Sequence, residues 1–162
     1  MDYNTIMKTS YYLHSIGILK LTYSKEKIYK IEKVDRFGKY DEKSLFSDSI
    51  NQEIKEYLNS KRENFSFYNN IEPKGTKFQM TVWNELKNIP YGDTKTYKEI
   101  AKSIGKPKAI RAVASAIGKN PIMIIIPCHR VIGSDGKLHG YAYGLDLKKK
   151  LLAIEKAPTK IN

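Results

Sequence analysis

Cysteine and histidine are scarce in this chain of 162 residues, which contains one cysteine, Cys128, and three histidines. One cysteine cannot close a disulfide within the chain, and so few sulfur and imidazole ligands exclude a cysteine-rich zinc site. We therefore expect no structural metal and no cofactor. A free thiol is typical of a reducing compartment, which favours the cytoplasm, or the nucleus if the source is eukaryotic.

Long apolar runs are absent as well. No stretch approaches the roughly 18 consecutive apolar residues of a membrane-spanning helix. The start, Met1–Asn4, is acidic and polar and so unlike a signal peptide. We expect no membrane partner, and the length fits one domain of ordinary size or two small ones.

The whole chain has a net charge of +12, and acidic residues are scarce in only one half of it. Residues 1–75 hold 13 Lys and Arg against 11 Asp and Glu, whereas residues 76–162 hold 16 against 6. A one-sided positive excess favours a polyanion as partner, and nucleic acid rather than membrane, because no long basic amphipathic helix is present. The alternative is a proteome that is rich in lysine throughout, which explains a high total better than an uneven one.

The first 70 residues predict a sheet followed by one helix. Apolar and aromatic residues recur at every second position in three segments between residues 11 and 31, which is typical of half-buried antiparallel strands. Apolar side chains at helical spacing follow within roughly 45–60, and Phe65–Tyr68 is a candidate short strand. No cluster here predicts a reactive site, and His14 is expected to be structural. We interpret residues 1–70 as a scaffold domain.

The segment 69–75 is the best linker candidate, because it is polar and contains both proline and glycine. Thr76–Gln79 then fits a capping box, in which the first side chain caps a helix and the fourth bonds back to it. The apolar spacing that follows predicts a helix over roughly 77–88. We therefore place a second domain at 71–162.

Two short helices joined by a turn are predicted next. A second capping box, Thr96–Glu99, opens a helix that ends near Ile104, and glycine and proline precede another helix over 108–117. This pair is typical of a helix-turn-helix. The second helix is rich in alanine around Arg111, so its backbone can come close to whatever it faces. Because this half of the chain is basic, a close approach to DNA explains the small side chains better. Close packing against another helix is the alternative explanation.

The cysteine lies in Pro127–Gly133, with His129 and Arg130 directly after it. A cysteine thiol has a pKa of about 8.5 and reacts as the thiolate, so a reactive cysteine needs a lowered pKa or a base beside it. A shift of roughly 1.5 units corresponds to about 2 kcal/mol, which one hydrogen bond to a charged group can supply. His129 makes Cys128 a candidate nucleophile. The alternative is a buried, inert thiol.

The segments around Cys128 complete the predicted second domain. Ile122–Ile126 is apolar and bounded by prolines, which favours a short buried extended segment. The glycine-punctuated loop 138–144 is expected to form a pocket wall that accepts a flat ring. A last helix is predicted over about 146–156, and its lysine run, 148–150, is expected to form a solvated face.

The predicted helices, the cysteine segment and the glycine-containing loop, taken in this order and at this spacing, resemble the O6-alkylguanine-DNA alkyltransferases. These proteins are also called methylated-DNA–protein-cysteine methyltransferases. The resemblance extends over about Gly75–Glu155, whereas the first 70 residues are similar only in length and in the order of strands and helix. The pieces that carry it include Gly75-Thr76-Lys77-Phe78-Gln79, Ile89-Pro90-Tyr91-Gly92, Arg111-Ala112-Val113 and Ile126-Pro127-Cys128-His129-Arg130-Val131-Ile132-Gly133.

The resemblance implies an α/β fold of two domains. Residues 1–70 would form a small antiparallel sheet with a helix, similar to ribonuclease H. Residues 71–162 would form a mostly helical domain with a winged-helix-like helix-turn-helix, which binds DNA and carries the reaction. The protein is expected to act as a monomer.

The resemblance further implies direct reversal of DNA damage. Cys128 would attack the alkyl carbon on O6 of guanine and keep the methyl group as a thioether, so that each molecule reacts once. His129 would act as the base and Glu155 would orient it, as in a catalytic triad. Tyr97 would give a proton to the leaving guanine, and Asn120 would brace the two helices and the active-site loop.

Double-stranded DNA is the implied partner, bound through its minor groove with the alkylated guanine flipped out of the stack. Arg111 would fill the gap that the base leaves. Alanines of the same helix would fit a groove only about 6 Å wide. The further implied DNA contacts are Tyr97, Ala109, Ala112, Ser115 and Arg130.

The implied guanine pocket comprises Val131, Ser134, Tyr141, Ala142 and Tyr143. In place of Tyr143, some relatives have glycine and others a bulky ring, and we expect the tyrosine to narrow the pocket against benzyl-sized groups. Two other functions are alternatives. A damage sensor without chemistry would lack the cysteine that is present here, and a cysteine hydrolase would need an oxyanion hole and an acyl substrate, which no feature indicates.

Overall fold

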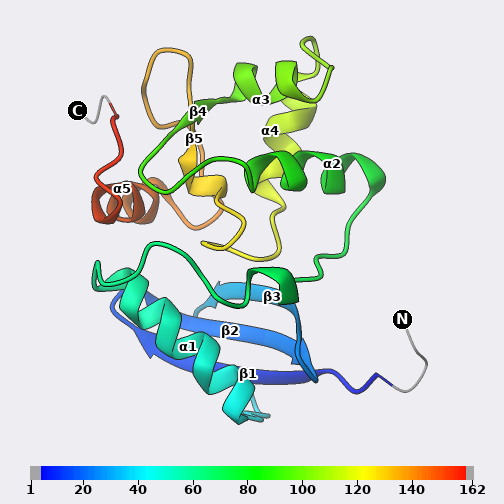
Figure 1. Ribbon diagram of the computed structural model, residues 1–162, viewed down its shortest axis with the longest axis vertical. Coiled ribbons are helices and arrows are strands. Elements are labelled where there is room, and N and C mark those ends of the chain that lie inside the picture. Colours follow the sequence, from blue (N-terminus) through cyan, green and yellow to red (C-terminus); the bar gives the residue numbers. More distant parts are fainter. Residues whose placement is uncertain (1–4, 160–162) are drawn as a thin grey trace. The chain divides into compact units, whose positions relative to one another are not determined.

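The computed structural model describes residues 5–159, so the acidic start at Met1–Asn4 lies outside the described residues. The chain divides into two compact units, Met1–Lys74 and Gly75–Asn162, and the division falls inside the expected linker. Each unit combines helices with strands, which makes the fold mixed α/β (Figure 1). Within the described residues, no helix is both long enough and apolar enough to cross a membrane.

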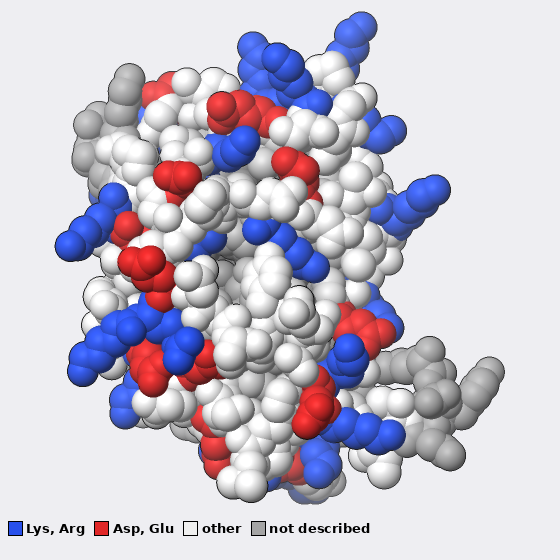
Figure 2. Space-filling model, in the orientation of Figure 1, with Lys and Arg blue, Asp and Glu red and all other residues white. Residues whose placement is uncertain are grey.

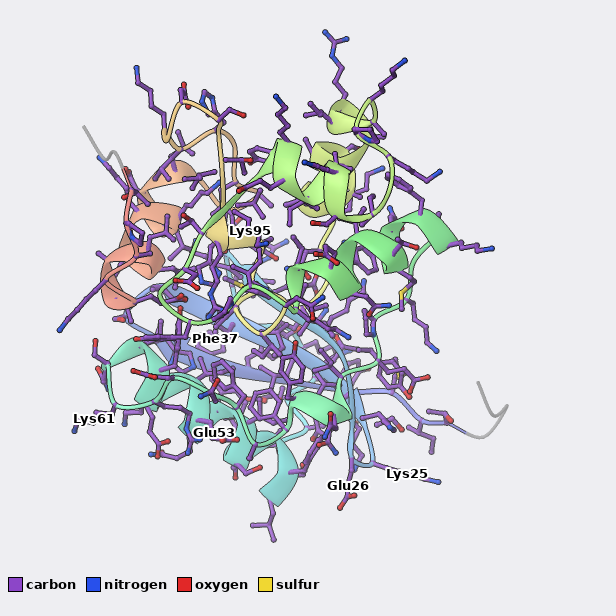
Figure 3. All side chains as sticks on the ribbon, turned by 45° about the horizontal axis from the view of Figure 1, so that its top comes forward. Lys25, Glu26, Phe37, Glu53, Lys61 and Lys95 are labelled. Atoms are coloured by element: carbon purple, nitrogen blue, oxygen red, sulfur yellow. The ribbon has the colours of Figure 1, made fainter. Side chains whose placement is uncertain are left out.

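The first unit is built on an antiparallel sheet of three strands in chain order: β1 (Lys8–His14), β2 (Gly17–Ser24) and β3 (Lys27–Val34). Leu21 in the central strand pairs with Ser10 of β1 and Ile31 of β3. Alternate residues of β2 are buried, as their period of two predicts. Figure 3 shows Lys25 and Glu26 at the turn between β2 and β3, where Lys25 has a φ of 52°.

Helix α1 (Leu45–Leu58) covers one face of this sheet (Figure 1). It begins at a capping box in which Ser44 caps the helix and Ser47 bonds back to the cap. Ile50 and Ile54, one turn apart, are both fully buried. The helix predicted over roughly 45–60 is therefore confirmed.

The prediction of a strand at Phe65–Tyr68 is wrong, because this segment is a turn that leads into the 3-10 helix η1 (Tyr68–Asn70). The backbone N–H of Ser66 donates to Oε1 of Glu53 at 3.0 Å, and the Ser66 hydroxyl donates to Oε2 at 2.7 Å. Glu53, labelled in Figure 3, extends from α1. In a strand, the backbone N–H of Ser66 would donate to a neighbouring strand, whereas here it donates to the Glu53 carboxylate.

The second unit contains the three predicted helices: α2 (Lys77–Leu86), α3 (Tyr97–Ser103) and α4 (Ile110–Gly118). Both predicted capping boxes are present. Thr76 caps α2 with Gln79 bonding back, and Thr96 caps α3 with Glu99 bonding back. Each box satisfies backbone N–H groups that the first turn of a helix leaves without partners.

Helix α4 begins two residues later than predicted and packs on α2. The N–H of Ala109 bonds to the carbonyl oxygen of Lys106 at 2.9 Å, which closes a turn before the helix. The buried Trp83 of α2 donates its indole N–H to the carbonyl oxygen of Ala116 at 2.8 Å. Close packing between α2 and α4 therefore explains the small side chain of Ala116, which is 2% exposed. It does not explain the small side chain of Ala112, which is exposed.

Two very short parallel strands, β4 (Lys95–Thr96) and β5 (Val131–Ile132), join the start of α3 to the segment that follows the cysteine. Two residues are too few to carry a periodic pattern, so the sequence analysis missed them. Helix α5 (Leu145–Ile154) then closes the unit, near the predicted range of 146–156.

The segment Ile122–Ile126 is buried as predicted but is not extended. It forms turns in which the N–H of Ile126 bonds back to the carbonyl oxygen of Ile122 at 3.1 Å, and Ile124 has a φ of 73°. A β-branched residue rarely adopts a positive φ, so surrounding contacts must hold it there. Asn120 provides two such contacts, to the N–H of Ile122 and to the carbonyl oxygen of Ile126.

Thr96→Ala is expected to lower the free energy of unfolding by about 1 kcal/mol, a typical loss for an N-cap. The hydroxyl of Thr96 accepts a hydrogen bond from the N–H of Glu99 at 3.1 Å, and alanine cannot replace it. Urea unfolding followed by circular dichroism measures the change. Thr81→Ala is the control, since Thr81 is exposed within α2 and should change stability by less than about 0.5 kcal/mol. Equal losses in the two variants would contradict the capping role.

Candidate active site at Cys128

The candidate site is a cavity of about 510 Å³ within the second unit. Residues of α3, α4, the cysteine turn and the loop 134–143 line it, among them Tyr97, Arg111, Asn120 and Cys128. Small-molecule sites commonly measure about 300–1,000 Å³. Four predicted site residues from separate segments thus share one cavity of a size that suits a flat base.

Cys128 begins the 3-10 helix η2 (Cys128–Arg130) and is 6% exposed. Burial raises the pKa of its thiol, while the hydrogen bond from Asn120, the charge of Lys148 and the hydroxyl of Tyr141 act in the opposite direction. The net direction is upward, so the thiol stays neutral and needs a base to become a nucleophile. An inert structural thiol would account for the burial, but not for the position at a cavity.

Asn120 links the end of α4 to the cysteine turn. Its amide group donates to the carbonyl oxygen of Ile126 at 2.7 Å and to Sγ of Cys128 at 3.1 Å. Its Oδ1 accepts from the N–H of Ile122 at 2.9 Å. One side chain therefore fixes both the path of the chain before the cysteine and the surroundings of the sulfur.

A buried carboxylate, that of Glu155, is shared by the two residues that follow Cys128. Nε2 of His129 lies 2.5 Å from Oε2 of Glu155, and Nε of Arg130 donates to Oε1 at 2.7 Å. The N–H of Gly92 donates to Oε1 at 3.2 Å. His129 is 0% and Glu155 3% exposed. The structure thus pairs His129 with the carboxylate that the sequence analysis assigned to it.

The electrostatics of this pair suit a base. Burial alone would raise the pKa of Glu155, but the hydrogen bonds and charges of His129 and Arg130 outweigh it and lower that pKa to about 2. Burial lowers the pKa of His129, and Glu155 acts in the opposite direction. At physiological pH, Glu155 is therefore ionised and the imidazole is neutral and able to accept a proton.

Arg130 is not placed as a DNA contact, which corrects the sequence prediction. It is 8% exposed, and its guanidinium donates to both oxygens of Glu155 and to the carbonyl oxygen of Ile89 at 2.7 Å. A guanidinium that is held by these acceptors inside the unit cannot reach a phosphate. Nothing in the local sequence distinguishes such an arginine from an exposed one.

Helix α4 presents three predicted DNA contacts, Arg111, Ala112 and Ser115, at exposed positions, and Ala109 before it is half exposed. Ile110, which the sequence analysis did not select, is 39% exposed and lines the cavity with Arg111. In Figure 2, basic side chains project from the region that holds α3 and α4 in Figure 1. The exposed lysines in and next to these helices include Lys102, Lys106, Lys108 and Lys119.

The loop after the cysteine forms the opposite wall of the cavity. Ser134, Tyr141, Ala142 and Tyr143 line it, as expected for the predicted guanine pocket. The rings of Tyr141 and Tyr143 meet edge to face, with centroids 5.8 Å apart. Val131 is 0% exposed within β5 and is not among the residues that line the cavity, so its predicted contact with guanine, which is made by its main chain, stays a prediction.

Tyr97 and Lys148 meet at this loop. The hydroxyl of Tyr97 donates to the carbonyl oxygen of His139 at 2.6 Å. Nζ of Lys148 donates to the same oxygen at 3.3 Å and to the carbonyl oxygen of Gly140 at 3.1 Å. Lys148 is 1% exposed, so the predicted solvated face is wrong for this residue, although Lys150 is exposed.

Chemistry at Cys128 would take place next to the helix pair, since α3 and α4 supply part of the same cavity. The fold and the site together define a mixed α/β protein in which a buried cysteine and a nearby pair of His129 and Glu155 accompany a cavity lined by two consecutive short helices. The family model "6-O-methylguanine DNA methyltransferase, DNA binding domain" matches residues 77–157. The chain belongs to this family, and the resemblance seen in the sequence is confirmed.

Individual relatives agree with the family model. The methylated-DNA–protein-cysteine methyltransferase of Methanosarcina barkeri is 56% identical over 115 residues, 71% of each chain. That of Haemophilus influenzae is 44% identical over 123 residues, 76% of this chain and 68% of the relative. The crystal structure of Mycobacterium tuberculosis OGT in complex with DNA superimposes with a TM-score of 0.84 at 37% identity, covering 93% of this chain and 95% of that one. The similarity therefore extends into the first unit.

Glu155→Gln is expected to reduce the loss of stability in acid. A carboxyl group whose pKa is lowered from 4.5 to about 2 by folding stabilises the fold above pH 4.5, and this contribution disappears as the pH falls towards 2. The contribution amounts to about 3 kcal/mol at neutral pH. Urea unfolding at a series of pH values from 7 to 2 should therefore show a shallower decline in the variant than in the wild type.

The control for this experiment is Glu63→Gln, which changes an exposed carboxylate of the first unit. Its profile should follow the wild type. Glu155→Gln should also be less stable at pH 7, because Arg130 is then left buried without a charged partner. Parallel declines in all three proteins would show that Glu155 does not carry the acid dependence.

Proposed function

We propose that this protein repairs DNA by moving an alkyl group, chiefly methyl, from O6 of an alkylated guanine to its own Cys128. The observation that carries the proposal is the position of Cys128 at a cavity walled by α3 and α4, with the buried pair of His129 and Glu155 next to it in the same unit. Family membership supports the reaction, and the DNA complex of the M. tuberculosis relative supports the partner.

The reaction is a displacement at the alkyl carbon. His129 accepts the thiol proton, directly or through a water, while Glu155 keeps the imidazole oriented. The bond from Sγ of Cys128 to carbon forms as the bond from carbon to O6 breaks, and the electron pair of that bond passes to guanine. Tyr97 supplies the proton that the departing guanine takes up. The thioether formed on Cys128 is not hydrolysed in neutral water, so each protein molecule reacts once.

The DNA is bound through its minor groove, with the target base flipped into the cavity. A stacked base cannot present its O6 substituent to the sulfur in line, so the base must leave the duplex. Arg111 occupies the gap in the stack. The small side chains of Ala109, Ala112 and Ser115 let α4 approach a groove that is only about 6 Å wide.

The finer architecture belongs to the same proposal. The first unit is a ribonuclease-H-like scaffold, supported by its three strands followed by one helix. The second unit is a winged-helix-like DNA-binding and transfer domain, supported by the pair α3 and α4. The protein works as a monomer in the cytoplasm, or in the nucleus of a eukaryotic source.

Incubation with a duplex that contains O6-methylguanine, followed by digestion and mass spectrometry, tests the proposal. The expected result is one methyl group on the Cys128 peptide and a reaction that stops at one equivalent. Cys128→Ala should still bind the duplex with unchanged affinity, because alanine preserves the cavity walls, but should remove no methyl group at all.

The same experiment separates the alternatives. Tight binding with no adduct on the wild-type protein would favour a damage sensor. Product formation that continues beyond one equivalent would favour a hydrolase. Methyl transfer that survives Cys128→Ala would exclude the assigned nucleophile.

Tyr143 is expected to make the site slow towards benzyl groups. Its ring lines the cavity and meets Tyr141 edge to face, so a benzyl group must displace it. Overpacking costs about 1–3 kcal/mol, which corresponds to a rate about 5- to 150-fold lower with O6-benzylguanine than with a methylated duplex. Tyr143→Gly should accelerate inactivation by O6-benzylguanine, and the control Tyr143→Phe, which keeps the ring, should not. Equal wild-type rates with the two substrates would contradict the prediction.

A further inference from the structure

The imidazole of His139 is a group at the cavity that the chemistry above does not use. Its residue lines the cavity, and its side chain is 56% exposed. Nε2 lies 3.0 Å from Oδ1 and 3.1 Å from Oδ2 of Asp135, whose side chain is 49% exposed. An exposed pair of this kind contributes little to stability. Stability therefore does not account for its position at the cavity.

The ring of His139 packs directly against Gly133. A methyl carbon added at Gly133 would lie 2.2 Å from Cδ2 and 2.6 Å from Nε2 of His139, and 2.6 Å from Oδ1 of Asp135. The φ of Gly133 is not positive, so its backbone conformation would accept alanine. Glycine is therefore required at this position by the space that the paired side chains of His139 and Asp135 occupy.

The turn that carries Asp135 is fixed by its own hydrogen bonds. The N–H of Gly133 donates to the carbonyl oxygen of Lys137 at 2.9 Å, and the N–H of Gly136 donates to the carbonyl oxygen of Gly133 at 2.9 Å. Oδ1 of Asp135 also accepts from the N–H of Lys137 at 2.9 Å. Gly133 directly follows β5, which pairs with β4. The imidazole thus attaches position 139 to a turn that continues from this strand pair.

The backbone of His139 is bonded on the other side, to α3. Its carbonyl oxygen accepts from the hydroxyl of Tyr97 at 2.6 Å. The cavity wall that includes Tyr141 and Tyr143 begins at the next residue, Gly140. A shift of His139 would therefore move both the acceptor that aims the Tyr97 hydroxyl and the start of this wall.

We propose that His139 is a positioning residue whose imidazole, held by Asp135 over Gly133, fixes the cavity wall and the oxygen that aims the Tyr97 hydroxyl. This inference rests on the function proposed above. His139 exchanges no proton in the reaction and acts only through the groups that it places. The effect on the rate can be large although the pair is exposed, because a misplacement of about 1 Å can cost about 10²-fold.

Substitution of His139 tests this role in single-turnover reactions with a methylated duplex at increasing protein concentration. His139→Ala should lower the maximal transfer rate roughly tenfold, since part of the positioning remains. Its affinity for the duplex should stay at the wild-type value, because phosphate contacts dominate binding. Lys137→Ala is the matched control, since it removes an exposed side chain of the same loop and keeps the backbone bonds. It should react at the wild-type maximal rate.

A conservative variant separates positioning from packing. His139→Gln keeps a flat group with an N–H that can donate to Asp135, so it should recover part of the rate lost in His139→Ala. Thermal unfolding should change little in either variant, because the pair is exposed. A large loss of thermal stability in His139→Ala, or no recovery in His139→Gln, would overturn the proposal.

Gly133→Ala tests the same arrangement from the other side. The added methyl group should displace the imidazole and slow methyl transfer about as much as His139→Ala does. In a His139→Ala background, the ring is already absent, so Gly133→Ala should cause little further loss. Additive losses would mean that Gly133 and His139 act independently, against the proposal.

Reaction with iodoacetamide shows whether the cysteine itself is disturbed. This reagent alkylates a thiol with release of iodide, which needs neither a proton from Tyr97 nor a bound base. His139→Ala should therefore react with it no more slowly than the wild type does, and equal slowing of both reactions would overturn the proposal. A wild-type protein that takes up no methyl group would overturn the proposed function. Normal transfer by both the wild type and His139→Ala would overturn only the role of His139.

Discussion

The second unit depends on one shared carboxylate. Glu155 follows the last turn of α5 and receives hydrogen bonds from the guanidinium of Arg130 and from the N–H of Gly92, while its other oxygen lies against His129. Removal of one partner from such a buried pair commonly costs about 3–5 kcal/mol, because an uncompensated charge stays behind. Fold stability and the orientation of the imidazole therefore rest on the same interaction.

Burial has opposite effects on the groups around the sulfur. It raises the pKa of Cys128 and lowers the pKa of His129 and Lys148, so each of the three is driven towards its neutral form. A neutral thiol that is 6% exposed reacts slowly with oxidants and with passing electrophiles. The arrangement thus favours reaction with a group that is held in the cavity, where proton transfer to and from neighbouring side chains can accompany bond formation.

The parts that were predictable from the sequence are those with a local signal. Capping boxes predicted α2 and α3, and apolar residues at every second position predicted the sheet. The turn conformation of Ile122–Ile126, by contrast, depends on hydrogen bonds to Asn120 and has no local sequence pattern. The burial of Arg130 depends on Glu155, which is distant in sequence. Lys148 did have a signal that went unused, because it lies four residues before Leu152 on the buried face of α5.

The position of Asn120 has a mechanical consequence. It stands two residues after the end of α4, and its amide group bonds to the sulfur of Cys128 and to the carbonyl oxygen of Ile126. Any tilt or shift of α4 therefore displaces the group that donates to the sulfur. One side chain therefore joins the end of the helix whose exposed face carries Arg111 directly to the reacting sulfur, with no other residue between them.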